Sequence, residues 1–583
     1  MPLFQPLSLN SARTSLLLLA LLYSAGALAE PASKAEVKAE VKTEAKPAAM
    51  VMAKPELSGE FVYKYLVGEI AGQRGDASLA GSVFMDLAKS SRDARLAERA
   101  AKAAVQGQNA PLAVQASQLW SDLDPDSIEA NQVSTQVLVS VGRLSAAKPH
   151  LQKLLLKPDT RANGFLYLNG LLSGQPDKQA VLNLMEELAK PYQDLPEARF
   201  SVAHAAWSNG LNTRALDELK AAEQLRPGWE LSAMLQGQIL AKQQAGSAMS
   251  FYDAFLQKYP ASDEVRMAYA RLLVSQKQIQ AAKTQFVKLL ESSKGSPEAL
   301  VVVGLLSLQL EDMTEAERYF KQSLEAGYRD PDQLYIYLGQ LNERRQELKQ
   351  AIAWYQKVQP GERLLAAKLS IASITARLEG TNAGIAQLDS LEKLNTEQEA
   401  VVQQAKANLL MQAKRHEESY AVLENAVSTL PNTPELIYDY AMAAERLQKM
   451  DVAERELRKL ILIKPDFAQA YNALGYSWAD RNIKLEEARK LIEKALELSP
   501  DDHYIMDSMG WVMYRLGKLD TAADYLRRAY TAQADPEIAA HLGEVLWQQG
   551  KRDEAVRTWE DALRAHPENE VLNTTRQKFK QAL

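Results

Sequence analysis

Small, aromatic and proline residues recur in a fixed order along most of the chain. At the C-terminal end, this order consists of Leu542, Gly543, Gly550, Ala555, Trp559, Ala562 and Pro567. Parts of the same order precede it at Gly510, Gly517, Ala522 and Ala529, and before that at Gly475, Ala488, Ala495 and Pro500. Equivalent residues lie about 34 residues apart, a spacing typical of repeats built from two helices.

The period extends toward the N-terminus and divides the chain into about 15 repeats. Their expected first residues are 61, 94, 127, 161, 196, 229, 263, 297, 332, 366, 400, 434, 468, 503 and 536. The twentieth position is alanine at residues 80, 113, 146, 180, 215, 248, 282, 316, 351, 453, 488, 522 and 555, with Ile385 and Ser419 as the exceptions. A small residue at one position of so many repeats indicates a recurring close contact.

Each repeat is expected to form two antiparallel helices joined by a tight turn. Small residues at positions 8, 20 and 27 let the two helices approach closely, and proline near position 32 ends the second helix. The repeat-packing residues expected in the C-terminal part are Gly475, Ala488, Gly510, Gly517, Ala522, Gly543, Ala555 and Ala562. Large residues at position 24 fill the space between repeats, at Phe84, Phe286, Phe320, Tyr355 and Trp559. Because one repeat cannot bury its apolar face alone, successive repeats are expected to stack around a continuous core.

The repeats differ in how closely they follow the pattern. Residues 57–195 are expected to form degenerate helical repeats, residues 196–567 a regular array, and residues 568–583 a polar capping helix. The repeats near 161 and 366 are degenerate, and the second of these carries Gly380 and Gly384 close together. It is a candidate joint in the array.

Residues 1–29 have the order of an export signal. Arg13 precedes the apolar run Leu16–Leu22, and Ala27-Leu28-Ala29 is an A-x-A cleavage site. The apolar stretch is shorter than the roughly 20 residues of a membrane-spanning helix, so cleavage after Ala29 is expected. Residues 30–56 contain Ala, Lys, Glu and Pro without an aromatic residue, and are expected to form a flexible tether.

Composition excludes several functions. Lys and Arg number 68 and Asp and Glu 74, a net charge of −6 with both signs intermixed, so no broad basic surface for nucleic acid is expected. The chain has no Cys, which excludes disulfides, cysteine nucleophiles, thiolate metal sites and attachment of lipid to an N-terminal Cys. We expect a periplasmic location without a stable membrane span; outer-membrane anchoring is not expected, although peripheral association with the membrane stays open.

Three local patterns imitate catalytic or ligand motifs. Gly475-Tyr476-Ser477-Trp478-Ala479 lacks the last Gly of a nucleophile elbow, and no strand precedes it. Gly510–Lys518 and Gly543–Lys551 are too widely spaced for a phosphate loop and lack the following Ser or Thr. His541 and Glu544 lie three residues apart and could share a metal, but a solvated or groove-lining pair is the preferred interpretation. We therefore expect no catalytic residue, no metal ligand and no cofactor.

Aromatic and charged residues gather on one face of the last repeats. Positions 2, 5, 9, 12 and 13 of the first helix are expected to face an inner groove. In the last four repeats these include Tyr438, Tyr476, Trp511, Tyr514, Trp547, Arg446, Arg515, Glu445 and Glu544. Tyr and Trp give a large contact area at little cost in side-chain entropy, so a protein-binding groove is predicted. The alternative is that the rings pack in the core.

The repeat pattern resembles the tetratricopeptide repeat family over residues 61–567, which implies a right-handed α-solenoid. Narrower stretches are similar to the LbcA group of outer-membrane repeat lipoproteins: residues 63–75, 267–276, 473–481, 507–530 and 539–555. That group binds a periplasmic carboxy-terminal processing protease and presents cell-wall hydrolases to it. This chain departs from the group because it lacks the lipidated Cys.

The leading hypothesis is a non-enzymatic adaptor that binds a protease and its clients together. The alternative is a scaffold for envelope polysaccharide export or outer-membrane assembly. An enzyme would need a catalytic domain of its own, and the repeats leave only the tether and a short C-terminal segment outside them.

Overall fold

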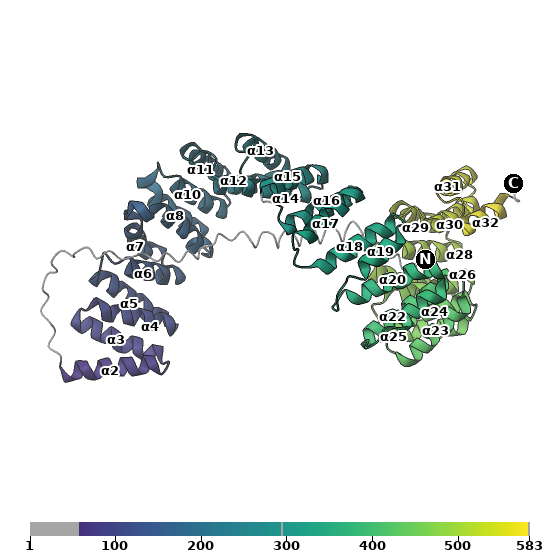
Figure 1. The fold of residues 1–583 in the computed structure, drawn as a ribbon, viewed down its shortest axis with the longest axis horizontal. Coiled ribbons are helices and arrows are strands. Elements are labelled where there is room, and N and C mark those ends of the chain that lie inside the picture. Colours follow the sequence, from purple (N-terminus) through teal and green to yellow (C-terminus); the bar gives the residue numbers. More distant parts are fainter. Residues whose placement is uncertain (1–57, 293–294, 581–583) are drawn as a thin grey trace. The chain divides into compact units, whose positions relative to one another are not determined.

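The computed structural model describes residues 58–292 and 295–580, and the expected signal and tether lie outside them. Within those residues, the chain forms 31 α-helices, α2 to α32, and no strand (Figure 1). The described chain divides into two compact units between Tyr328 and Arg329. This division was not among the expected boundaries. The boundary expected between residues 195 and 196 lies inside the first unit, where α10 packs against α8 and α9.

The N-terminal unit consists of antiparallel helix pairs, coloured from purple to teal in Figure 1. Its helices are α2 (Gly59–Gln73), α3 (Ala77–Ser91), α4 (Ala94–Gln106), α5 (Ala110–Leu123), α6 (Ile128–Ser140), α7 (Leu144–Leu156), α8 (Pro158–Ser173), α9 (Lys178–Ala189), the short 3₁₀ helix η2 (Lys190–Tyr192), α10 (Pro196–Ser208), α11 (Asn212–Leu225), α12 (Glu230–Gln243), α13 (Ala245–Lys258), α14 (Asp263–Ser275), α15 (Ile279–Ser292), α16 (Pro297–Gln309) and α17 (Met313–Glu325).

The C-terminal unit continues the same pairing. Its helices are α18 (Pro331–Arg344), α19 (Leu348–Tyr355), α20 (Leu364–Glu379), α21 (Thr381–Asp389), α22 (Thr396–Gln412), α23 (His416–Thr429), α24 (Pro434–Arg446), α25 (Met450–Ile463), α26 (Ala468–Asp480), α27 (Leu485–Leu498), α28 (His503–Arg515), α29 (Leu519–Ala532), α30 (Pro536–Gln548), α31 (Arg552–Ala565) and α32 (Glu570–Lys580).

The helix pairs follow the 34-residue period read from the sequence. The even-numbered helices α2 to α30 are the first helices of the pairs, and α24, α26, α28 and α30 begin at the expected residues 434, 468, 503 and 536. The predicted all-α array of helix-turn-helix repeats is therefore confirmed.

Small residues bring the two helices of a repeat together. A Cβ atom on Gly510 would lie 2.5 Å from Leu526 Cγ, and one on Gly475 would lie 2.6 Å from Ile492 Cγ1. A Cβ on Gly543 would overlap the indole of Trp559. The alanines of the same set, Ala488, Ala522, Ala555 and Ala562, are all buried. These positions hold no larger side chain without displacing the neighbouring helix.

Two details of the predicted packing are wrong. Gly517 is exposed in the turn after α28, and a Cβ there would meet nothing within 4 Å; its φ of +76° shows that it serves the left-handed turn conformation. In the third repeat, Ala146 is exposed and Ala147 is buried, so the alanine of the close contact lies one residue later than expected.

The large position-24 side chains fill the core as predicted. Phe84, Phe286, Phe320, Tyr355 and Trp559 are all buried. Around the degenerate repeat near residue 366, the second helices are short, with 8 residues in α19 and 9 in α21. The role of this repeat as a joint stays a prediction.

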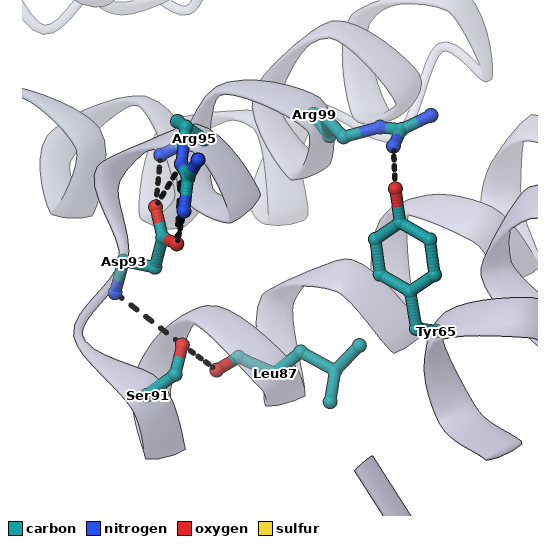
Figure 2. A network of polar contacts seen from close by, with 6 residues as sticks. All are labelled: Tyr65, Leu87, Ser91, Asp93, Arg95 and Arg99. Atoms are coloured by element: carbon teal, nitrogen blue, oxygen red, sulfur yellow. Dashed lines mark hydrogen bonds and ion pairs between the residues drawn. The ribbon is translucent and has the colours of Figure 1, made fainter. Parts of the chain in front are cut away.

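Polar contacts connect neighbouring repeats in the N-terminal unit (Figure 2). Arg99 on α4 donates a 2.7 Å hydrogen bond to the hydroxyl of Tyr65 on α2, exactly one period earlier, and its guanidinium lies 4.7 Å from the centre of the Phe84 ring. Asp93 caps α4 by accepting a 2.9 Å bond from the backbone N–H of Arg95. The cap and the cross-repeat bond thus fix the start of α4 against α2 and α3.

Helix α32 covers the last repeat. The ring of Phe579 lies 5.6 Å from Trp547 and 5.5 Å from Trp559, and Leu572 is fully buried. In the described part of the chain, no helix combines the length and apolar character needed to cross a membrane.

Candidate protein-binding groove

The C-terminal unit contains a cavity of about 510 Å³ that crosses several consecutive repeats. Its wall is formed chiefly by the first helices of five repeats, α22, α24, α26, α28 and α30. Because successive repeats place equivalent residues side by side, residues one period apart meet there: Asp507 and His541 are 34 residues apart and in direct contact. The groove is therefore a product of the repeat geometry, shared between repeats and absent from any one of them.

Tyr476 on α26 is one of the aromatic residues that line this cavity, together with Tyr504 and His541. Burial raises the pKa of its hydroxyl, and the negative charges of Asp507, Asp480, Glu537 and Glu445 raise it further. These four carboxylates come from α24, α26, α28 and α30. The phenol thus sits in a strongly negative environment.

His541 on α30 and Asp507 on α28 form an ion pair at the cavity wall. His541 Nδ1 lies 3.0 Å from each carboxylate oxygen of Asp507, and its ring stacks on Trp511 with centroids 4.2 Å apart. Burial lowers the pKa of His541, but the charge and hydrogen bond of Asp507 outweigh it, so the pKa is raised. Of the two residues expected to form a solvated or groove-lining pair, His541 lines the cavity, whereas Glu544 is outside its lining and accepts hydrogen bonds from Tyr514 and Lys578.

Two more carboxylates lie on α24. Burial raises the pKa of Asp439 to about 6, although a 2.6 Å hydrogen bond donated by the Gln404 amide opposes the rise. Burial also raises the pKa of Glu445, against a hydrogen bond from Ser477 and the charge of Arg481. Partly desolvated carboxylates of this kind gain from a cation brought into the cavity.

Several polar groups of the cavity have no partner in the described chain. Asn472 is only 2% exposed, and its Oδ1 accepts no hydrogen bond. Arg446, at the end of α24, and Glu537, on α30, are both exposed. Neither forms an ion pair with a described residue. Such unused groups are available to a ligand.

The structure separates the residues predicted for the groove. Tyr476, Arg446 and Glu445 line the cavity. Arg515 is not part of the lining; it donates a 2.9 Å hydrogen bond to the backbone oxygen of Asp480 and forms a 3.7 Å ion pair with the carboxylate of that residue. Tyr438 packs on Phe467 with ring centroids 5.6 Å apart. A role in binding stays a prediction for all of them.

The open positions predicted for Trp511 and Trp547 are wrong. Trp511 is 6% exposed because His541 of the following repeat stacks on it, and Trp547 is 8% exposed because Phe579 of α32 packs against it. Tyr514 is half-buried and donates a 3.1 Å hydrogen bond to Glu544. Burial, together with the negative charge of Glu544, raises the pKa of the Tyr514 hydroxyl to about 12. The two indoles are packing residues.

The sequence pattern missed most of the polar lining. Glu537 occupies position 2 of its repeat, Asn472 and Asp507 position 5, and Asp439 and His541 position 6. Positions 2 and 5 were on the expected inner face, so the polar residues Glu537, Asn472 and Asp507 at these positions were the available signal. Among the residues that the structure describes, no group of three His, Asp or Glu side chains could hold a metal ion.

Comparisons with known proteins agree with this architecture. A family model described as "Tetratricopeptide repeat" matches residues 267–331, 304–363, 438–503, 484–538 and 540–570. The chain is 30% identical over 505 residues to TPR repeat-containing protein PA4667 of Pseudomonas aeruginosa, a match that covers 85% of each chain. It is 39% identical to human Tetratricopeptide repeat protein 7A over 89 residues, 15% of this chain and 10% of that protein.

Solved structures with similar helical arrays include the Naa15/Naa10 complex bound to HypK, at 12% identity, 87% and 81% coverage and a TM-score of 0.32. The Cut9–Hcn1 structure has 12% identity, 84% and 97% coverage and a TM-score of 0.30. Given its 30% identity to the Pseudomonas protein over 85% of each chain, and the match of the repeat model, this chain belongs to the tetratricopeptide repeat family.

Proposed function

We propose that the chain is a non-enzymatic periplasmic adaptor that holds a carboxy-terminal processing protease and presents envelope or cell-wall hydrolase clients to it. The repeat family indicates a protein-interaction scaffold. The export-signal pattern of residues 1–29 supports the compartment, and the stretches similar to the LbcA group support the protease as partner.

The observation that carries the proposal is the cavity on α22 to α30. It is lined by the ring of Tyr476, by charged groups of which Arg446 and Glu537 form no ion pair with a described residue, and by the buried Asn472, whose Oδ1 accepts no hydrogen bond. A groove that crosses successive repeats suits an extended segment of another protein, because each repeat offers contacts to a different part of it. The cavity is accordingly the proposed client site.

A second surface supports a separate site for the protease. On α2, Val62, Leu66 and Ile70 follow one another at four-residue spacing, and Tyr63 lies beside them; all four side chains are exposed. Apolar residues at this spacing share one helix face, and an exposed apolar face of this kind marks a protein contact. Two sites on one chain would raise the effective concentration of client around protease.

Reconstitution with purified proteins tests this function. The chain is expected to speed cleavage of a client hydrolase by the protease about a hundredfold. This acceleration is expected when the client concentration is below the Kd of the direct complex between client and protease. A Leu66→Glu, Ile70→Glu double variant should lose this acceleration because it no longer binds the protease, while its binding of the client is unchanged.

The matched control is Leu462→Glu, which places a charge at an 82% exposed apolar residue of α25. It should accelerate cleavage like the parent chain. Equal cleavage rates with and without the parent chain would contradict the adaptor function, and would leave the scaffold of polysaccharide export or outer-membrane assembly as the better hypothesis.

A further inference from the structure

We infer that the cavity on α22 to α30 binds a lysine- or arginine-containing segment of the client, whose cationic group lies against Tyr476 and donates to Asn472 Oδ1. The inference rests on the proposed function and specifies which client segment the adaptor recognises. It follows from three independent features of the cavity: its charge, its aromatic ring and its unpaired acceptor.

The charged residues of the cavity lining are predominantly acidic. Its carboxylates are Asp439, Glu445, Asp480, Asp507 and Glu537, against the two guanidinium groups of Arg446 and Arg481. Even with His541 protonated, negative charge is in excess. A segment that carries positive charge gains from this field, whereas an acidic segment is repelled.

Few of these carboxylates are neutralised within the chain. Glu537 forms no ion pair with a described residue, and Asp480 forms a long, solvent-exposed ion pair with Arg515, at 3.7 Å. Asp507 is paired with His541, whereas Asp439 accepts its 2.6 Å hydrogen bond from the uncharged amide of Gln404. The negative charge is therefore available to a ligand.

The ring of Tyr476 gives the cation a place to bind. It lines the same cavity as Glu445, Asp480, Asp507 and Glu537, which come from four different helices and whose negative charges act on its hydroxyl. A Lys ammonium or Arg guanidinium over an aromatic face is attracted by the ring electrons, and nearby carboxylates strengthen its hold. An aromatic residue in a cavity with several carboxylates thus favours a cation over a neutral apolar group.

Asn472 supplies the second and independent indication. Its Oδ1 is buried at the cavity wall with no hydrogen-bond donor. A carbonyl oxygen can only accept, so the missing partner must be a donor, and ammonium and guanidinium groups carry several. A carboxylate from an acidic segment could not satisfy it.

Fluorescence anisotropy with the full chain tests the inference. The probe is a short labelled Gly/Ser peptide with two adjacent Lys residues; the comparison peptides carry Gln or Glu at the same positions. The Lys peptide should bind at least about tenfold more tightly than the Gln peptide, a difference of about 1.4 kcal/mol, and added salt should weaken its binding. The Glu peptide should not bind.

An Asp480→Asn, Glu537→Gln double variant should bind the Lys peptide about tenfold more weakly. Both residues are exposed, so the change should leave folding intact. The control is Glu487→Gln with Asp501→Asn, which removes the same charge from exposed residues outside the cavity and should leave the affinity unchanged.

Equal affinity for the Lys and Gln peptides, or no binding of any peptide, would overturn the inference. Equal losses of affinity for the Lys peptide in the cavity variant and in its control would also overturn it, because the net negative charge of the whole chain would then explain binding. If the Lys peptide binds but the chain does not accelerate cleavage by the protease, the adaptor function is wrong and the cation site stands. If the chain accelerates cleavage but does not prefer the Lys peptide, only the cation site is wrong.

Discussion

Replacement of Ala555 by Arg is expected to unfold the end of the C-terminal unit first. Ala555 on α31 is 0% exposed, so the new side chain has no space and its charge no partner. Overpacking together with an uncompensated buried charge should cost about 3–5 kcal/mol. Because each repeat contacts mainly its neighbours, the loss should be greatest in α30 and α31 and should weaken toward α24.

Hydrogen exchange followed by mass spectrometry measures this directly. Peptides from α30 and α31 should lose protection, while those from the N-terminal unit keep it. The control Ala534→Arg places the same side chain at an exposed residue between α29 and α30 and should exchange like the parent. Unchanged protection in the Ala555→Arg variant would refute the assigned packing of α31.

The second large effect is expected for Gly543→Ala. One added methyl group would overlap the indole of Trp559, which packs against this glycine and whose Nε1–H donates to the backbone oxygen of Ala540. Since Trp559 is enclosed by Trp547 and Phe579, it cannot move aside freely. The substitution should cost about 1–3 kcal/mol despite the better helix propensity of alanine.

Urea unfolding followed by tryptophan fluorescence should show this loss. Gly361→Ala, in the same unit, meets nothing within 4 Å and should leave the midpoint close to that of the parent. A Gly543→Ala variant as stable as the Gly361→Ala control would show that α30 and α31 are less closely packed than the structure has them.

The sequence was sufficient for the repeat architecture because its signals are local. Each repeat contains its own turn and its own small residues, and α24, α26, α28 and α30 begin at the residues the period predicts. The exception at Ala146 and Ala147 arises where the repeat is degenerate, so the period alone could not fix which alanine faces the partner helix.

The groove could be predicted only in part, because burial there depends on the neighbouring repeat. Tyr476 and Arg446 occupy inner positions and line the cavity. Trp511 and Trp547 occupy similar positions, but His541 covers one and Phe579 the other. The acidic lining comes from four helices, and its concentration around one ring emerges only when the repeats are stacked.

Site-specific photo-crosslinking tests most directly whether clients dock in this cavity. Benzoylphenylalanine would replace Tyr476 in one variant and, as the control, Leu462 on α25 in another. With purified client, the account predicts strong crosslinking from position 476, competition by the Lys peptide, and little product from position 462. Equal crosslinking from both positions, or crosslinking from position 462 alone, would contradict it.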